Sequence, residues 1–305
     1  MKTPLYQRIL YKISGEALLG DQPSGIDPNF VARVVDDVLE AKELGCSIAL
    51  AVGGGNIFRG VQLASGGADR VTGDHMGMLA IVMNALAIRM VFDARDVGAT
   101  VLSGLAVPQV CETFTQRGMI EARDRGDVRI FAGGTGNPYF TSDTGAALRA
   151  AEFGADAILK GTQVDGIYTS DPKKNIKAER LNTLTHDELI EKKLAVMDTS
   201  AAVIARDNRI DVVVFSLHEP GSLARVLSGQ GTYSTVSAKQ AGPGNEDCSH
   251  RRVCRRETKT REDTTWLTVS ILRTWRSAWM ARWPPSPRIS VACGQAAPPL
   301  RFWIR

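Results

Sequence analysis

Short apolar segments alternate with longer amphipathic segments over residues 1–236, and this alternation limits the possible folds more than any other feature. Strands are predicted at residues 8–13, 47–52, 99–103, 128–132, 156–160 and 211–216, and helices near residues 27–45, 74–98, 109–125, 143–153, 186–192 and 199–208. Strands separated by helices at this spacing form parallel β-α-β units. The sequence therefore predicts an α/β fold, a three-layer α/β/α sandwich with a mainly parallel central sheet.

The composition changes after Ser237. All five tryptophans and six of the thirteen prolines follow this point, without alternation of strands and helices. We expect one domain at residues 1–236 and a low-order basic tail, rich in Trp, Arg and Pro, at residues 237–305. One hypothesis is that the tail is extraneous and arises from translation in a shifted reading frame. The alternative is a tail whose arginines and tryptophans bind nucleic acid or an acidic partner.

The positive charge of the chain belongs to this tail. The formal net charge is +4, but from Lys239 onward 13 Lys or Arg face 5 Asp or Glu, so the main domain is slightly acidic. The main domain therefore gives no electrostatic argument for nucleic-acid binding. No apolar run approaches the roughly 18 residues of a membrane span, and the N-terminus leads into a strand, so we expect a cytoplasmic protein with no membrane partner. The isolated Cys46 and Cys111 support neither a disulfide framework nor a zinc site.

A glycine-rich turn follows the second predicted strand. Gly53, Gly54 and Gly55 lack Cβ atoms, so their backbone amides can approach a phosphoryl group closely. Arg59 adds a cation that can bind phosphate through two hydrogen bonds. The turn predicts a phosphate site, and the alternative is a tight strand-to-helix turn with an exposed arginine.

Two further segments supply polar side chains where parallel strands end, which is where α/β sheets bind ligands. Lys12 ends the first strand before Ser14 and Gly15, so it can bind phosphate, although an ordinary surface lysine is the alternative. Asp74 lies at the predicted start of a helix. It is interpreted either as an N-cap or as a hydrogen-bonding partner for ribose hydroxyls.

The loops after the fourth and fifth strands carry aromatic and polar side chains. Tyr139, Phe140 and Thr141 lie together just before a helix, which favours binding of a base over an ordinary loop. Lys160 ends the next strand, and Tyr168 offers a ring on which adenine can stack. Between them, Asp165-Gly166 is typical of a hairpin turn.

Six ordered motifs together resemble the amino-acid kinase fold and, within it, the bacterial uridylate (UMP) kinases. The resemblance covers about residues 5–235 and rests on Lys12–Leu18, Gly53–Arg59, Gly73–Leu79, Thr135–Asp143, Val164–Pro172 and Val196–Asp198. The resembling enzymes end close to Gly231-Thr232, so the tail departs from the family. The resemblance implies transfer of the γ-phosphoryl group of MgATP to UMP, giving UDP and ADP in pyrimidine nucleotide biosynthesis.

The resemblance also implies roles for individual residues. The expected catalytic residues are Lys12, Arg59, Lys160, Asp143 and Asp198. ATP is expected to contact Lys12, Ile13, Ser14, Gly15, Gly55, Arg59, Thr162, Tyr168 and Asp171. UMP is expected to contact Gly54, Asp74, Thr135, Gly136, Asn137, Pro138, Tyr139, Phe140, Thr141 and Ser142.

Cofactor, assembly and regulation are likewise implied by the resemblance alone. Mg²⁺ is expected to enter as MgATP, with no direct protein ligand assigned. The family forms homohexamers that GTP activates and UTP inhibits. The segment linked to the GTP effect matches Gly20, Asp21, Gln22, Pro23, Ser24 and Gly25.

Three other functions are compatible with parts of the pattern. A kinase for a carboxylate or carbamate would share the ATP half, but Asp74 would repel an anionic carboxylate. A dinucleotide-binding oxidoreductase would need a third glycine where the chain has Phe58, and Asp74 follows no predicted strand. A non-catalytic nucleotide sensor fits less well because Lys12, Arg59 and Lys160 are all present.

Overall fold

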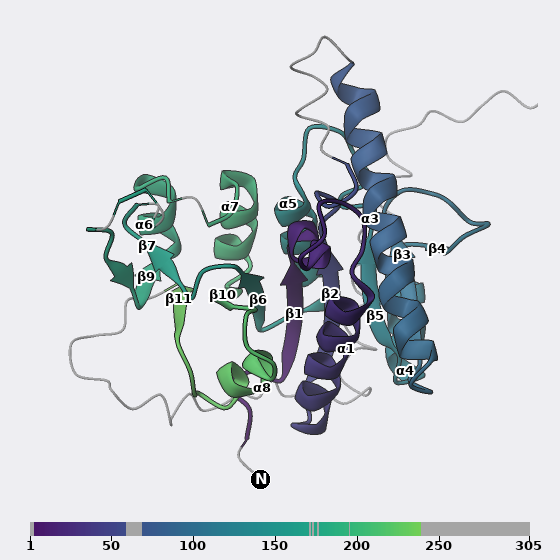
Figure 1. Cartoon of the computed structure of the whole chain (residues 1–305), viewed down its shortest axis with the longest axis horizontal. Helices are drawn as coiled ribbons and strands as arrows, with labels where there is room; N and C mark the ends of the chain where they lie inside the picture. The colour runs from purple at the N-terminus through teal and green to yellow at the C-terminus, as the bar shows by residue number, and fades with distance from the viewer. Residues whose placement is uncertain are drawn as a thin grey trace, which may run out of the picture. The chain divides into compact units, whose positions relative to one another are not determined.

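The computed structural model describes residues 3–58, 69–170, 172, 174–175, 177–194 and 196–238. Within them a nine-stranded sheet has the order β4-β3-β5-β2-β1-β6-β10-β11-β9, in which only the β10–β11 pair is antiparallel (Figure 1). The strands are β1 (Arg8–Ile13), β2 (Ser47–Val52), β3 (Ala99–Ser103), β4 (Glu112–Thr113), β5 (Val128–Ala132), β6 (Ala157–Thr162), β9 (Thr183–Thr185), β10 (Asp211–Ser216) and β11 (Tyr233–Ser237).

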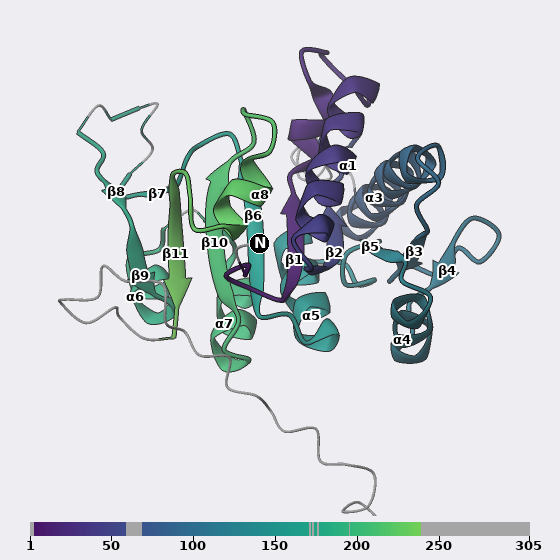
Figure 2. The same cartoon turned by 90° about the horizontal axis from the view of Figure 1, so that it is seen from below.

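Helices cover both faces of the sheet, which gives the predicted three layers (Figure 2). One face packs against α1 (Pro28–Glu43), α3 (Arg70–Asp93) and α8 (Ser222–Leu227). The other packs against α4 (Gln116–Asp124), α5 (Ser142–Phe153), α6 (His186–Glu191) and α7 (Thr199–Asp207). A short 3₁₀ helix, η1 (Gly15–Leu19), follows β1, while β7 (Ile167–Tyr168) and β8 (Arg180–Leu181) form a separate antiparallel pair.

Alternation along β1 decides which layer each side chain enters. Ile9, Tyr11 and Ile13 are fully buried among α1, α3 and α8, whereas Leu10 is buried on the opposite face. Because side chains alternate between faces along a strand, Lys12 lies on the face of Leu10. This face carries α5, so the register of β1 directs Lys12 toward the start of that helix.

The helix starts partly confirm the sequence-based predictions. Asp27 caps α1 by accepting a hydrogen bond from the Asn29 amide at 2.9 Å, and Pro28 is the first helical residue, as expected. The long helix begins earlier than predicted, because its N-cap is Asp69, which accepts from the Thr72 amide at 2.8 Å. The N-cap interpretation of Asp74 is therefore wrong, and this carboxylate lies inside the helix.

Two other local expectations are wrong. The segment predicted as a helix at residues 109–125 contains the edge strand β4 and then α4, which begins after the N-cap Thr115. Asp165-Gly166 does not join two paired strands, because β6 pairs with β1 and β10, while β7 pairs with β8. Both errors concern two-residue strands, which are too short to produce a periodic pattern.

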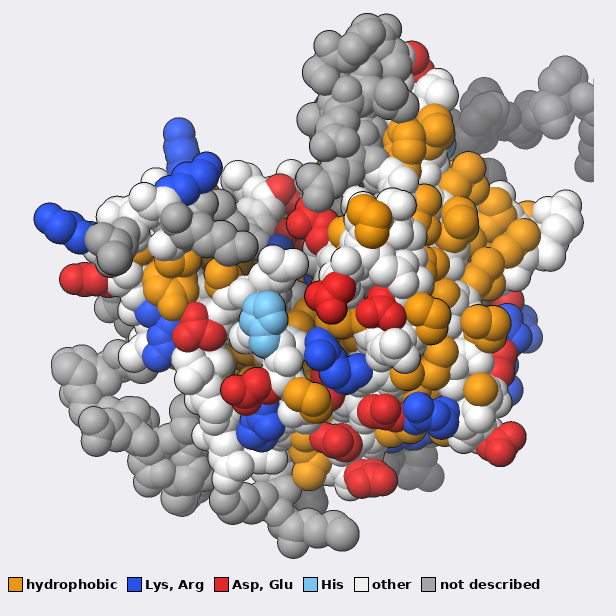
Figure 3. Space-filling view, viewed as in Figure 1, with side chains coloured by type: hydrophobic (Ala, Val, Ile, Leu, Met, Phe, Trp, Pro, Cys, Tyr) orange, Lys and Arg blue, Asp and Glu red, His pale blue; other side chains and the backbone are white. Residues whose placement is uncertain are grey.

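One side of α3 is exposed and apolar. By length and composition α3 could cross a membrane, but Ile81, Ile88 and Phe92 are buried against the sheet, as in the core helix of a globular domain. The space-filling view displays hydrophobic side chains gathered over α3 (Figure 3). Its exposed apolar residues are Met76, Leu79, Met83 and Met90.

Candidate functional site

Two lysines lie next to each other where the central strands end. β1 and β6 are parallel neighbours, and their register places Lys12 directly beside Lys160. Lys12 is 4% exposed, so both the fold and its burial separate it from an ordinary surface lysine. Two ammonium groups that are largely shielded from water require a nearby negative charge.

Asp143, in the first turn of α5, supplies that charge. Its Oδ1 accepts a hydrogen bond from Lys12 Nζ at 2.8 Å, and its Oδ2 accepts one from Lys160 Nζ at 2.5 Å. Burial alone would raise the pKa of Asp143, but the two ammonium groups overcome it and hold this pKa well below its usual value. Two lysines and one carboxylate leave a net positive charge, which favours an anionic ligand such as phosphate.

Asp198 links the starts of two helices, α5 and α7. It is the N-cap of α7, accepts from the Ala201 amide at 3.0 Å, and also accepts from the hydroxyls of Thr141 and Thr144. These bonds join the start of α7 to the start of α5. Lys160 Nζ also donates to the carbonyl oxygen of Val196, two residues before Asp198. Asp198 thus fixes the elements that carry Asp143, and its charge also acts on Lys160 without a direct hydrogen bond.

The turns after β1 and β2 pack against each other without side chains between them. A Cβ atom on Gly15 would lie 2.6 Å from the Gly55 nitrogen and 2.8 Å from the Gly53 carbonyl oxygen. No other residue type fits at Gly15 without displacing this backbone. The close approach places the Lys12–Gly15 turn beside the glycine-rich turn, so both can contact one phosphate chain.

A cleft of about 160 Å³ lies between the glycine-rich turn, the first turns of α3 and the loop before α5. Its lining includes most of the residues expected to contact UMP, namely Gly54, Asp74, Thr135, Asn137, Phe140, Thr141 and Ser142, together with Gly55, Phe58, Gly73, Gly77, Met78, Ile81 and Gly134. The expected residues Gly136, Pro138 and Tyr139 belong to the same loop but do not line the cleft. The fold therefore gathers segments distant in sequence around one small cavity.

Asp74 connects two walls of the cleft. Its carboxylate accepts from Arg70 Nε at 3.0 and 2.9 Å and from the Tyr139 amide at 2.7 Å. Tyr139 has a φ of 71°, an unfavourable backbone conformation for a tyrosine, and its ring lies 5.6 Å from the Arg70 guanidinium carbon. Asp74 thus holds the loop before α5 against α3 while remaining at the cleft surface.

The residues expected on the ATP side are less closely grouped. Ser14 caps η1, and Ile13 is buried at the end of β1. Thr162 ends β6 and donates to the Val164 carbonyl at 2.7 Å, while the Tyr168 hydroxyl donates to Asp165 at 2.6 Å. Neither Thr162 nor Tyr168 lines the cleft. Arg59 and Asp171 lie outside the described residues.

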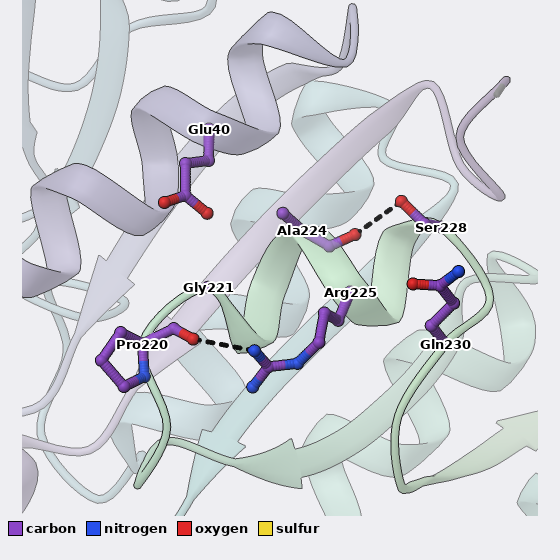
Figure 4. A pocket seen from close by; sticks show the side chains of 7 residues that line it. All are labelled: Glu40, Pro220, Gly221, Ala224, Arg225, Ser228 and Gln230. Carbon is purple, nitrogen blue, oxygen red and sulfur yellow. Dashed lines mark hydrogen bonds between the residues drawn. The ribbon is translucent and has the colours of Figure 1, made fainter. Parts of the chain in front are cut away.

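A second hollow, of about 400 Å³, lies between α1 and α8 (Figure 4). Its lining contains none of the predicted site residues and consists of Glu40, Pro220, Gly221, Ala224, Arg225, Ser228 and Gln230. Arg225 points back to its own segment, where it donates to the Pro220 carbonyl at 3.0 Å and to Glu219 at 2.8 Å.

In the part of the chain that is described, no three His, Cys, Asp or Glu side chains form a group that could chelate a metal.

Sequence reasoning missed a buried amide pair beside the cleft, formed by Asn56 and Asn84. The available signal was an asparagine inside the apolar stretch of residues 76–88. A buried amide needs hydrogen-bonding partners, so Asn84 required an explanation that periodicity could not give.

Comparison with known proteins gives one consistent family. The model of the amino acid kinase family matches residues 7–216. The uridylate kinases of Brucella anthropi and Rhizobium meliloti are each 55% identical over 234 residues, which cover 77% of this chain and 98% of each relative. The solved UMP kinase of Bacillus anthracis has a TM-score of 0.73 at 32% identity, covering 77% of this chain and 97% of its own. That of Ureaplasma parvum has a TM-score of 0.72 at 34% identity, covering 76% and 98%.

Proposed function

We propose a mechanism for this chain, which belongs to the amino acid kinase family and acts as a uridylate kinase. In this mechanism the buried Lys12–Asp143–Lys160 cluster stabilises the γ-phosphoryl group of MgATP as the group moves to UMP. The observation that carries the proposal is this cluster, at the ends of two neighbouring strands and close to a cleft with a carboxylate at its wall. Phosphoryl transfer requires alignment of the two substrates and stabilisation of charge on the transferred group. No nucleophilic side chain is needed, because the UMP phosphate is the nucleophile.

Asp143 keeps the two lysine side chains in place in the absence of substrate. When a phosphate chain arrives, the lysines can donate to its oxygens without large rearrangement, since their side chains already point to one place. The backbone of the Lys12–Gly15 turn and of Gly55 is proposed to contact the same phosphates, since backbone amides need no ionisation to donate. Arg59 is proposed to act between donor and acceptor phosphates.

UMP, the phosphoryl acceptor, is proposed to bind in the cleft. Asp74 would accept hydrogen bonds from the ribose hydroxyls of UMP, and the loop residues Thr135 to Ser142 would surround the base and phosphate. Thr162, Tyr168 and Asp171 are proposed for the adenosine of ATP. The position of Thr162 and Tyr168 outside the UMP cleft is consistent with two separate nucleotide sites.

Mg²⁺ is proposed to enter with ATP. Both oxygens of Asp143 accept from lysines, and both oxygens of Asp198 accept from Thr144. These carboxylates therefore fit an ion that is carried by phosphate oxygens better than one held in a protein cage. The ion would neutralise charge on the phosphates of MgATP.

A coupled assay of ADP formation tests the function directly. With MgATP held constant, UMP, CMP, dUMP and N-acetylglutamate are compared as acceptors. We expect UMP to have the highest kcat/KM, and N-acetylglutamate to give no ADP above background. A preference for the carboxylate acceptor, or ADP formation that does not depend on any acceptor, would contradict the proposal.

The first predicted effect concerns the ribose contact. Asp74→Asn should raise the KM for UMP by roughly 10- to 100-fold and leave the KM for ATP within about threefold, because a charged hydrogen bond contributes about 1.5–3 kcal/mol. Steady-state kinetics with each substrate varied in turn measures the two constants. Asp69→Asn is the matched control, since asparagine also caps helices well and Asp69 does not line the cleft. Equal increases for both substrates would argue against a ribose contact.

Assembly and regulation follow the family in this proposal. The exposed apolar side chains Met76, Leu79, Met83 and Met90 on α3 give a second copy of the chain a surface to bury, which supports self-association, and a homohexamer is proposed from the family resemblance. GTP is proposed as activator, acting through residues 20–25, and UTP as inhibitor. We also propose a cytoplasmic location.

We further propose that residues 1–236 contain the whole catalytic domain. A chain truncated after Ala238 should keep the kcat of the full chain within about twofold and gain solubility, because it lacks all five tryptophans of the full chain. Activity and light scattering of the two purified proteins at equal concentration measure both effects. Loss of activity or of assembly in the truncated chain would mean that the tail belongs to the working protein.

A further inference from the structure

The amides of Asn56 and Asn84 form a reciprocal pair beneath the glycine-rich turn. Asn84 Nδ2 donates to Asn56 Oδ1 at 2.7 Å, and Asn56 Nδ2 donates to Asn84 Oδ1 at 2.9 Å. The second hydrogen of each amide is also used. Asn84 donates to the Gly53 carbonyl at 2.7 Å and Asn56 donates to the Gly25 carbonyl at 2.8 Å. All four amide hydrogens thus have acceptors.

This pair is costly to bury and does not line the cleft. Asn84 is fully buried and Asn56 is 5% exposed, and neither lines the cleft. An apolar pair at these positions would fill the space without the penalty of desolvating two amides. The polar pair therefore requires a reason other than packing, and its bond to the Gly53 carbonyl supplies one.

The bond to Gly53 fixes the orientation of the peptide that joins Gly53 and Gly54. In a trans peptide the C=O and the following N–H point in opposite directions. With the Gly53 carbonyl directed to Asn84, the Gly54 N–H is directed away from it. The Gly53 amide is held as well, since it donates to the Ile13 carbonyl at 3.0 Å. Gly54 lines the cleft, and its N–H donates to no described residue.

We propose that Asn84 is a positioning residue for the kinase reaction, which orients the Gly53–Gly54 peptide so that the Gly54 N–H faces the phosphate of the acceptor nucleotide. The inference rests on the proposed assignment of the cleft to UMP. Without the amide, the glycine peptide can rotate at small cost, because glycine has few conformational restrictions. The donor would then have to be ordered at each binding event, which weakens UMP binding and leaves the ATP side largely unchanged.

Two variants of the full-length enzyme test the proposal. Asn84→Leu keeps the number and branching of the side-chain heavy atoms but removes both amide hydrogens, and should raise the KM for UMP about tenfold or more at every pH, with less than a threefold change for ATP. Asn84→Asp removes the donors only while the new carboxyl group is ionised. Burial raises the pKa of a carboxyl group, so the KM ratio of this variant to the wild type should fall between pH 8 and pH 6, as one donor is regained.

Ile88→Val is the matched control, because Ile88 is fully buried one turn further along α3 and does not line the cleft. It should reduce stability without changing either KM. An unchanged KM for UMP in folded Asn84→Leu would overturn the proposal, as would equal increases for UMP and ATP. If the leucine variant does not fold, a KM ratio for Asn84→Asp that is independent of pH overturns it. Absence of UMP-dependent ADP formation in the wild type would instead contradict the proposed function, before any variant is compared.

Discussion

Replacing Lys12 by methionine should lower kcat at least 100-fold while the protein stays folded. Methionine has nearly the length of lysine and tolerates burial, and Lys160 remains paired with Asp143 at 2.5 Å, so the carboxylate keeps a partner. What is lost is a cation aimed at the transferred phosphoryl group, whose contribution is made mainly in the transition state. Single-turnover kinetics at saturating MgATP and UMP measures the chemical step directly.

Lys192→Met is the matched control for this variant. Lys192 is exposed at the end of α6 and forms only a loose pair, at 3.7 Å, with Glu188 among the described residues. Its replacement should leave kcat unchanged. Near-normal turnover of folded Lys12→Met would exclude Lys12 from the catalytic residues. A loss of thermal stability as large as the loss of rate would indicate a structural role instead.

Replacing Asp143 by asparagine should have the largest effect on stability. The change keeps the shape but leaves two buried ammonium groups without a counter-charge, and breaking a buried pair in this way costs about 3–5 kcal/mol. Because the pKa of Asp143 is held below its usual value in the folded state, its ionisation stabilises the fold at neutral pH. This stabilisation is complete above the pKa of an unfolded aspartate, about 4, and is lost as the pH falls below it.

Urea unfolding of wild type and Asp143→Asn at several pH values measures this effect. The difference in unfolding free energy should be greatest near pH 7 and should shrink below about pH 4, where Asp143 of the unfolded wild-type chain takes up a proton while the folded carboxylate is still ionised. Asp93→Asn is the control, since Asp93 pairs with Arg89 on the exposed surface of α3, and exposed pairs contribute about 0–1 kcal/mol. A difference for Asp143→Asn that does not vary with pH would contradict the assigned electrostatic role.

The order and type of the main elements were predictable because their causes are local. Strands β1 and β2 have the predicted bounds, and α1 begins after the predicted cap. Both signals are local, because the spacing of apolar residues is read within one strand and an N-cap bonds within the first turn of its helix. The start of α3 was not predictable, because Asp69 and Asp74 are both good caps and only the folded chain decides between them. Strand β4 was missed because a strand of two residues is too short to show an alternation of apolar and polar side chains.

The sequence by itself determined the family, the alternation of strands and helices, and the glycine turns that follow strand ends, because each of these is written in residues close together along the chain. Only the tertiary structure decided which side chains meet. Lys12 and Asp143 are 131 positions apart, and their pairing depends on the register of β1 against β6 and on the packing of α5. Asn56 and Asn84 meet for the same reason: hydrogen bonding between distant segments follows from how the layers pack, which no local pattern encodes.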